Sequence, residues 1–152
     1  MMVVKNRYLF VSVGLLVLAL SASPQNLDNF TRKYGPPDDN GHYKVRPDVL
    51  MRVSSKDGKR VREIVIDTQV DSKVPAEAIH DVLDEVIEEL APTSLRGRRI
   101  SAGITFQSSC NSIGHRTEYD NVKIGRISTC ESASGKNVIK YRAIILWKSP
   151  PP

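Results

Sequence analysis

The chain has 152 residues, with 22 Lys and Arg against 17 Asp and Glu, a net charge of +5, and 40% of its residues are apolar. This length is short for a two-domain enzyme, and the composition is not that of a disordered or collagenous protein. The basic excess is too small to indicate a nucleic-acid partner by charge alone, so no nucleic-acid binding is predicted.

The first 22 residues have the pattern of a secretory signal peptide. Lys5 and Arg7 form a positive start, the run Leu9–Leu20 is mostly apolar, and small residues follow it up to Ala22. We therefore predict cleavage after Ala22, with export to the periplasm or the medium and no transmembrane segment afterwards. An uncleaved N-terminal anchor is the alternative, although the apolar run is shorter than the roughly 20 residues that span a bilayer. Without residues 1–22 the chain keeps 20 basic and 17 acidic residues.

The first elements after the signal are a short helix and a β-hairpin. Residues 26–34 predict the helix, because Leu27, Phe30 and Tyr34 recur on one helical face before a Gly-Pro-Pro sequence. An extended segment is expected from Tyr43 to Arg46. The hairpin is predicted from residues 49–53 and 61–66, which flank a turn centred on Asp-Gly.

The next predicted element is the main helix, from about Pro75 to Leu90. Pro75 suits the first helical position. An apolar stripe at helical spacing is formed by Ile79, Val82, Leu83, Val86 and Leu90. Acidic residues occupy the other faces, which we interpret as a solvated surface. Carboxylates paired for cation binding or acid–base chemistry are the alternative.

The second half predicts three more strands. Residues 100–107 alternate as a half-buried strand, 108–120 is expected to be a polar loop, and 131–136 a turn between the strands 122–127 and 138–147. The predicted fold class is α+β: a single antiparallel sheet of about four to five strands packed against one main helix, with a short N-terminal helix. Residues 23–148 form one domain, and the Pro-rich tail 149–152 is predicted to be disordered.

Cys110 and Cys130 are the only cysteines. In an exported protein an even count predicts a disulfide, and two cysteines allow only one intramolecular pair. A catalytic cysteine, with Cys110 near His115, is the alternative. It has no sequence signature, because a nucleophile also needs a group that orients its base.

The sequence shows no recognisable catalytic or metal motif. His42, His80 and His115 are dispersed, and neither an H-E-x-x-H nor a C-x-x-C pattern is present. A nucleophile-elbow G-x-S-x-G and a phosphate-binding glycine loop are also missing. No catalytic residue, metal site or cofactor is therefore predicted, although a catalytic site assembled only by folding stays open.

Basic residues cluster in two places, on the hairpin and after the main helix. If the fold brings them together, they form an anion-attracting patch; ordinary solubilising charge is the alternative. The candidate anion-binding residues are Lys56, Lys59, Arg60, Arg62, Arg96, Arg98 and Arg99.

Five segments carry a resemblance: residues 30–38, residues 43–47, the Asp57-Gly58 hairpin, Ser109-Cys110-Asn111, and residues 118–122. They resemble a group of small secreted bacterial proteins with no established activity. More distantly, a helix ending in Gly-x-Pro before a hairpin is similar to small outer-membrane assembly lipoproteins and to β-lactamase inhibitor proteins. That likeness implies a binding module, although the lipid-anchor Cys of the lipoproteins is missing here.

These observations favour an exported domain that binds rather than catalyses, with a protein or an anionic envelope component as partner. A small secreted hydrolase is the alternative. A concave pocket that joins His115 or His42 to a carboxylate would favour the hydrolase.

Overall fold

The computed structural model describes residues 26–68, 74–107, 112–133 and 136–149. Their elements are α1 (Leu27–Tyr34), β1 (His42–Arg46), β2 (Val49–Ser55), β3 (Val61–Thr68), α2 (Ala76–Leu90), α3 (Thr93–Arg96), β4 (Arg99–Gln107), β5 (Ser112–Tyr119), β6 (Val122–Ala133) and β7 (Lys136–Trp147). The predicted signal peptide, Cys110 and residues 150–152 lie outside the described residues. None of the described helices has the length and apolar character that a membrane span requires.

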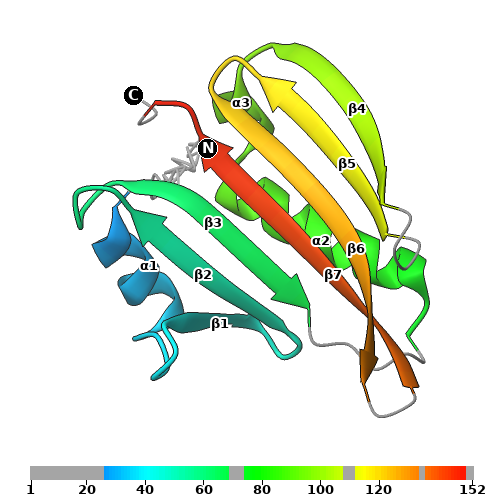
Figure 1. Cartoon of the computed structure of the whole chain (residues 1–152). Coiled ribbons are helices and arrows are strands. Elements are labelled where there is room, and N and C mark those ends of the chain that lie inside the picture. The colour runs from blue at the N-terminus through cyan, green and yellow to red at the C-terminus, as the bar shows by residue number, and fades with distance from the viewer. Residues whose placement is uncertain (1–25, 69–73, 108–111, 134–135, 150–152) are drawn as a thin grey trace, which may run out of the picture.

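The predicted fold class is wrong in its proportions. Instead of four to five strands against one main helix, the described chain is mostly sheet, with seven antiparallel strands and three short helices. The strand order is β1-β2-β3-β7-β6-β5-β4 (Figure 1). The chain therefore builds two antiparallel groups, β1 to β3 and β4 to β7, and joins them where β3 pairs with β7.

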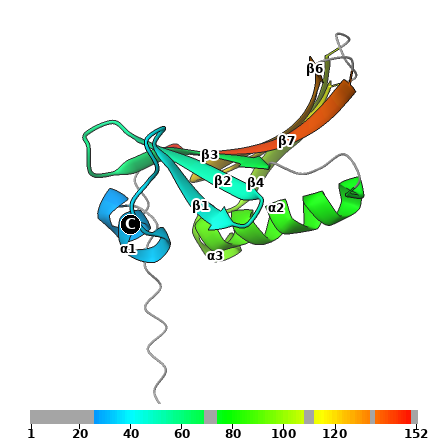
Figure 2. The ribbon, with the colours of Figure 1, turned by 90° about the horizontal axis from the view of Figure 1, so that it is seen from below.

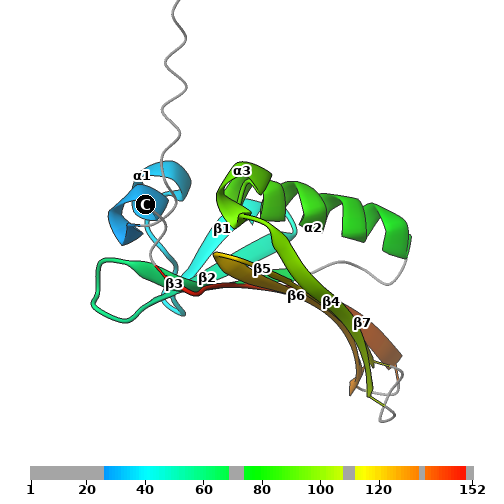
Figure 3. The same cartoon turned by 90° about the horizontal axis from the view of Figure 1, so that it is seen from above.

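The helices lie on one face of this sheet, and the opposite face is free of helices (Figures 2 and 3). Burial along β3 follows the two-residue period of a strand. Ile64, Ile66 and Thr68 are buried toward the helices, whereas Val65 on the other face is half-buried. The hydroxyl of Thr68 donates to the carbonyl of Tyr141 at 3.0 Å, so the one buried polar residue of the described core is satisfied.

α2 covers the middle of the sheet and packs against β7. It occupies the residues where the main helix was predicted, but its buried stripe differs by one position. Ile87 is buried, whereas Val82, assigned to the stripe from the sequence, is 36% exposed. An ion pair between Arg126 of β6 and Asp84 also links the helix to the sheet.

α1 is held at its start by hydrogen bonds and ends at a glycine. The Asn26 side chain caps its start by accepting from the backbone N–H of Asp28 at 3.1 Å. Leu27 N–H donates to the carbonyl of Lys59, which ties the helix to the β2–β3 turn. Gly35 ends the helix with φ of 82°, a conformation that favours glycine.

The largest errors of the sequence prediction concern β5 and β4. The predicted polar loop 108–120 contains the strand β5, whose backbone is paired on both sides by β4 and β6. The predicted half-buried strand 100–107 is β4, but residues 100–106 are all exposed. Both results follow from the strand order. β5 lies between β4 and β6, which pair with its backbone, and β4 is the last strand, away from β7, against which α2 packs.

Candidate functional site

The β2–β3 turn is held by the carboxylate of Asp57. Its Oδ1 accepts from the backbone N–H groups of Arg60 at 2.7 Å and Lys59 at 3.0 Å, and from the Ser55 hydroxyl at 3.1 Å. These hydrogen bonds, that from Arg60 foremost, lower the pKa of Asp57 to about 2. Gly58 has φ of 73°, which makes the tight turn possible. The turn thus fixes the backbone from which several basic side chains extend.

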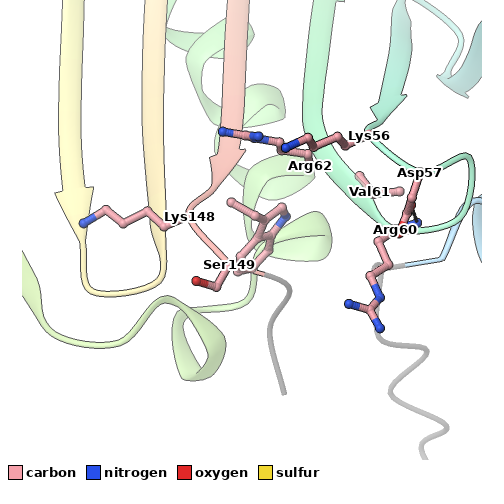
Figure 4. A pocket seen from close by; sticks show the side chains of 8 residues that line it. Lys56, Asp57, Arg60, Val61, Arg62, Lys148 and Ser149 are labelled. Atoms are coloured by element: carbon pink, nitrogen blue, oxygen red, sulfur yellow. Dashed lines mark hydrogen bonds between the residues drawn. The ribbon is translucent and has the colours of Figure 1, made fainter.

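Next to this turn lies a hollow of about 410 Å³, which we call the basic hollow (Figure 4). It lies between the hairpin and the end of β7. It is lined by Lys56, Asp57, Arg60, Val61, Arg62, Trp147, Lys148 and Ser149. Four cationic side chains and one carboxylate therefore line it, and that carboxylate already accepts three hydrogen bonds within the turn. The arrangement suits an anionic group.

The cations of the basic hollow differ in how they are compensated. The ammonium of Lys148 lies 2.8 Å from the carboxylate of Glu118. The side chains of Lys56, Arg60 and Arg62 form no ion pair with any carboxylate that the structure describes. Three cationic side chains without a described acidic partner thus line one hollow, with Lys56 and Arg62 close together and Arg60 directed away from them (Figure 4). Lys148 was not among the residues singled out from the sequence.

The indole of Trp147 lines the same hollow. Its side chain is only 2% exposed, and its Nε1 has no hydrogen-bond partner among the described atoms. A buried donor without a partner costs about 1–3 kcal/mol of stability. Trp147 therefore lines the basic hollow while its indole N–H is itself buried.

The three residues of the second basic cluster, Arg96, Arg98 and Arg99, have different surroundings. The Arg96 guanidinium is bound by Glu88 at 2.6 Å and by the carbonyl of Ala91 at 2.6 Å, and it lies 5.7 Å from the ring centre of Tyr119. It therefore holds α3 in place. The Arg98 side chain, in contrast, is 86% exposed and lies 4.0 Å from the carboxylate of Asp120, and Arg99 is also exposed.

The fold does not bring the two predicted clusters together at the basic hollow. β7, β6 and β5 separate β3 from β4 in the sheet. Of the seven residues named from the sequence, the hollow gathers Lys56, Arg60 and Arg62, while Lys59 is exposed outside it. Arg98 and Arg99 lie at the start of β4, so they offer a matched comparison for the three residues of the hollow.

The helix-free sheet face carries a second hollow, of about 510 Å³, that the sequence analysis missed. Its apolar surface comes from Ile127, Ile144 and Leu146, and it deepens where Gly114 and Gly125 provide no side chain. We call it the apolar hollow. Gly114 and Gly125 were the signal in the sequence from which it could have been found.

One carboxylate, that of Glu118, binds a lysine from each of the two hollows. Glu118 binds Lys148 of the basic hollow at 2.8 Å and Lys123 of the apolar hollow at 3.4 Å. The hydrogen bond from Lys148, with that from Lys123, lowers the pKa of Glu118. Glu118 is therefore ionised at neutral pH and neutralises cations between the two hollows.

His42 and His115 lie in different surroundings in the described structure. His42 lies 3.5 Å from Asp38, but Asp38 also accepts from the His42 backbone and shapes the turn before β1. His115 lines the apolar hollow beside Arg116 and Lys123, and no Asp or Glu is among the described residues lining it. In the described ranges no three His, Cys, Asp or Glu side chains gather as a metal site would require.

The disulfide stays a prediction, because Cys110 lies outside the described residues; the backbone of Cys130 pairs with Ile139 in the β6–β7 ladder. We expect the unreduced protein to show no titratable thiol. Cys110→Ala should lower the free energy of unfolding by about 3 kcal/mol, because the cross-link restricts the unfolded chain. Urea titration followed by circular dichroism measures this loss. Cys130→Ala should lose the same amount and the double variant no more; additive losses would contradict the disulfide.

In the comparisons with known proteins, no family model, curated protein or solved structure matches the chain.

Proposed function

We propose that the protein is an exported, non-catalytic binding module that recognises an anionic group of the cell envelope at the basic hollow. The observation that carries this proposal is the meeting of Lys56, Arg60 and Arg62 at one hollow without described acidic partners. Export rests on the signal pattern of residues 1–22.

The geometry of the hollow supports a small anionic group as the ligand. A volume of about 410 Å³ lies within the usual range for small-molecule sites, roughly 300–1,000 Å³. Arginine guanidinium groups bind phosphate and carboxylate through paired N–H groups, and lysine adds a point charge.

The hydrolase alternative has weaker support. Acid–base catalysis with histidine needs the imidazole in a pocket beside an orienting or reacting group. His42 is engaged with Asp38 in a turn, and His115 lines its hollow with two cations instead of a carboxylate. The positions of both histidines therefore favour binding over hydrolysis.

The fluorescence of Trp147 provides a direct test, because it is the chain's single tryptophan and it borders the basic hollow. We expect its emission to change on titration with vesicles containing phosphatidylglycerol and to stay constant with phosphatidylcholine vesicles. Added salt should weaken binding, since the attraction is ionic. Inorganic phosphate, tested separately, distinguishes a free anion from a lipid headgroup.

Paired variants distinguish the hollow from bulk charge. The double variant Arg60→Gln, Arg62→Gln should weaken binding by about tenfold or more, since hydrogen bonds to charged groups contribute about 1.5–3 kcal/mol. The double variant Arg98→Gln, Arg99→Gln removes the same charge at the start of β4 and should bind almost as the parent does. Equal losses in the two variants, or no response to either anionic probe, would contradict the proposal.

A further inference from the structure

β4 is an edge strand with an exposed apolar row. It pairs with β5 on one side and is the last strand of the sheet on the other. Ile104 and Phe106 lie on one face of it and are 57% and 74% exposed, and Ile100, at an irregularity of the pairing between Arg99 and Ser101, is 54% exposed. Ile113 of β5, which pairs with Phe106, is also exposed, at 39%. Unpaired backbone groups and an apolar row together form a template for another strand.

The opposite edge of the sheet is protected in the usual ways. β1 has only five residues, its pairing with β2 is irregular between Lys44 and Arg46, and Pro47 follows it directly. Lys, bulges and Pro are the devices that keep edge strands from pairing. β4 has nine residues, and the eight from Ile100 to Gln107 include no Pro and no charged residue. Its one irregularity lies at its start, between Arg99 and Ser101, and its pairing with β5 is regular from Ser101 to Gln107.

We propose that two copies of the chain associate through β4, which pairs antiparallel with β4 of the second copy to form one continuous sheet. The occupant is a second copy because the strand is complementary to itself. Pairing centred on Gly103 places Ala102 opposite Ile104 and brings Phe106 to position 100, where the irregularity of β4 begins, so apolar side chains meet across the symmetry axis.

The charge pattern agrees with this register. Arg99 is the only charged residue of β4, and the same register places it opposite position 107, an uncharged Gln. No like charges therefore face each other across the two strands. The contact uses the same patch on both copies, so it closes as a two-fold dimer instead of growing into a fibre.

The dimer goes beyond the proposed anion binding and does not depend on it. β5 and β6 lie between β4 and β7, so the basic hollow stays open in the assembly. A dimer then carries two such hollows, and a surface with many anionic groups can be bound at both.

Sedimentation equilibrium over a concentration series tests the association, with the chain expressed with its own N-terminus and purified as the cell processes it. We expect twice the monomer mass at the higher concentrations. Phe106→Lys should raise the dimer dissociation constant at least about tenfold, because it places a charge in the apolar row. Val82→Lys, which changes an exposed apolar residue of α2, should leave the dissociation constant unchanged.

Amide hydrogen exchange identifies the paired edge itself. In a monomer, alternate residues of β4 direct their N–H groups to solvent, whereas pairing on both sides protects consecutive residues. We expect consecutive protection along residues 100–106 in the parent dimer and alternate protection in Phe106→Lys. Circular dichroism should show that the variant is folded. A monomeric parent at all concentrations, or a dimer with alternate protection in β4, would overturn the proposal.

Discussion

Leu83→Ala is expected to lower the free energy of unfolding by about 2–5 kcal/mol. Leu83 is 1% exposed on the side of α2 that faces the sheet and belongs to the main core cluster. Its removal leaves a cavity between helix and sheet that neighbouring side chains fill only in part. Urea denaturation followed by far-ultraviolet circular dichroism measures the loss.

Val82→Ala is the matched control, because Val82 is the preceding residue of the same helix and is 36% exposed. We expect its effect to be below about 1 kcal/mol, since a surface substitution removes little buried area. Losses of equal size in the two variants would contradict the orientation of α2 on the sheet. The pair therefore tests the point at which the stripe predicted from the sequence differs from the structure.

Local sequence patterns predicted a helix or strand correctly where the residues of that element determine its conformation. The Asp57-Gly58 turn between two alternating segments predicted β2 and β3, and the structure shows the Asp57 carboxylate closing that turn. α2 was predicted in the same way, from a helical apolar stripe behind Pro75. In each of these elements the signal lies within about 20 consecutive residues.

β5 was missed because its stability comes from its neighbours. Its inward positions include His115 and Thr117 instead of a continuous row of apolar residues. The segment therefore has the polar composition that is expected of a loop. Backbone pairing with β4 and β6 makes it a strand nonetheless, an example of tertiary context overriding propensity. The sheet therefore has more strands than the sequence pattern predicted.

The sequence predicted the type of residue that forms the candidate site, but not which residues line it. The hairpin cations were found from their local density, whereas Lys148 joins them only because β7 pairs with β3. Arg96 was grouped with its basic neighbours, yet Glu88 and Ala91 hold it on α3. Strand order decides which charges meet, and no local pattern encodes strand order.

Stability should fall as the solution is acidified, and Glu89 is the main described cause. Its carboxylate joins three elements by binding the Tyr34 hydroxyl at 2.7 Å, Lys33 at 2.7 Å and Arg46 at 2.8 Å. Burial, the largest single influence, raises its pKa. The hydrogen bonds from Lys33, Tyr34 and Arg46 together outweigh burial and lower the pKa from 4.5 to about 2.

The lowered pKa determines the direction of the effect. The folded state holds Glu89 ionised more strongly than the unfolded state does, so its contribution is present above pH 4.5 and is lost as the pH falls toward 2. The full difference corresponds to about 3 kcal/mol. Solvent screening reduces it to about 1–2 kcal/mol, because the side chain is 22% exposed.

Glu89→Gln should therefore lower the free energy of unfolding at pH 7 by about 1–2 kcal/mol and flatten its decline between pH 4.5 and 2. Urea titrations at a series of pH values measure both effects. Glu85→Gln removes a carboxylate from the exposed surface of the same helix and should keep the decline seen in the parent. An unchanged decline in Glu89→Gln would mean that another group binds the protons, and the three contacts to Glu89 would then not link α1, β1 and α2 energetically.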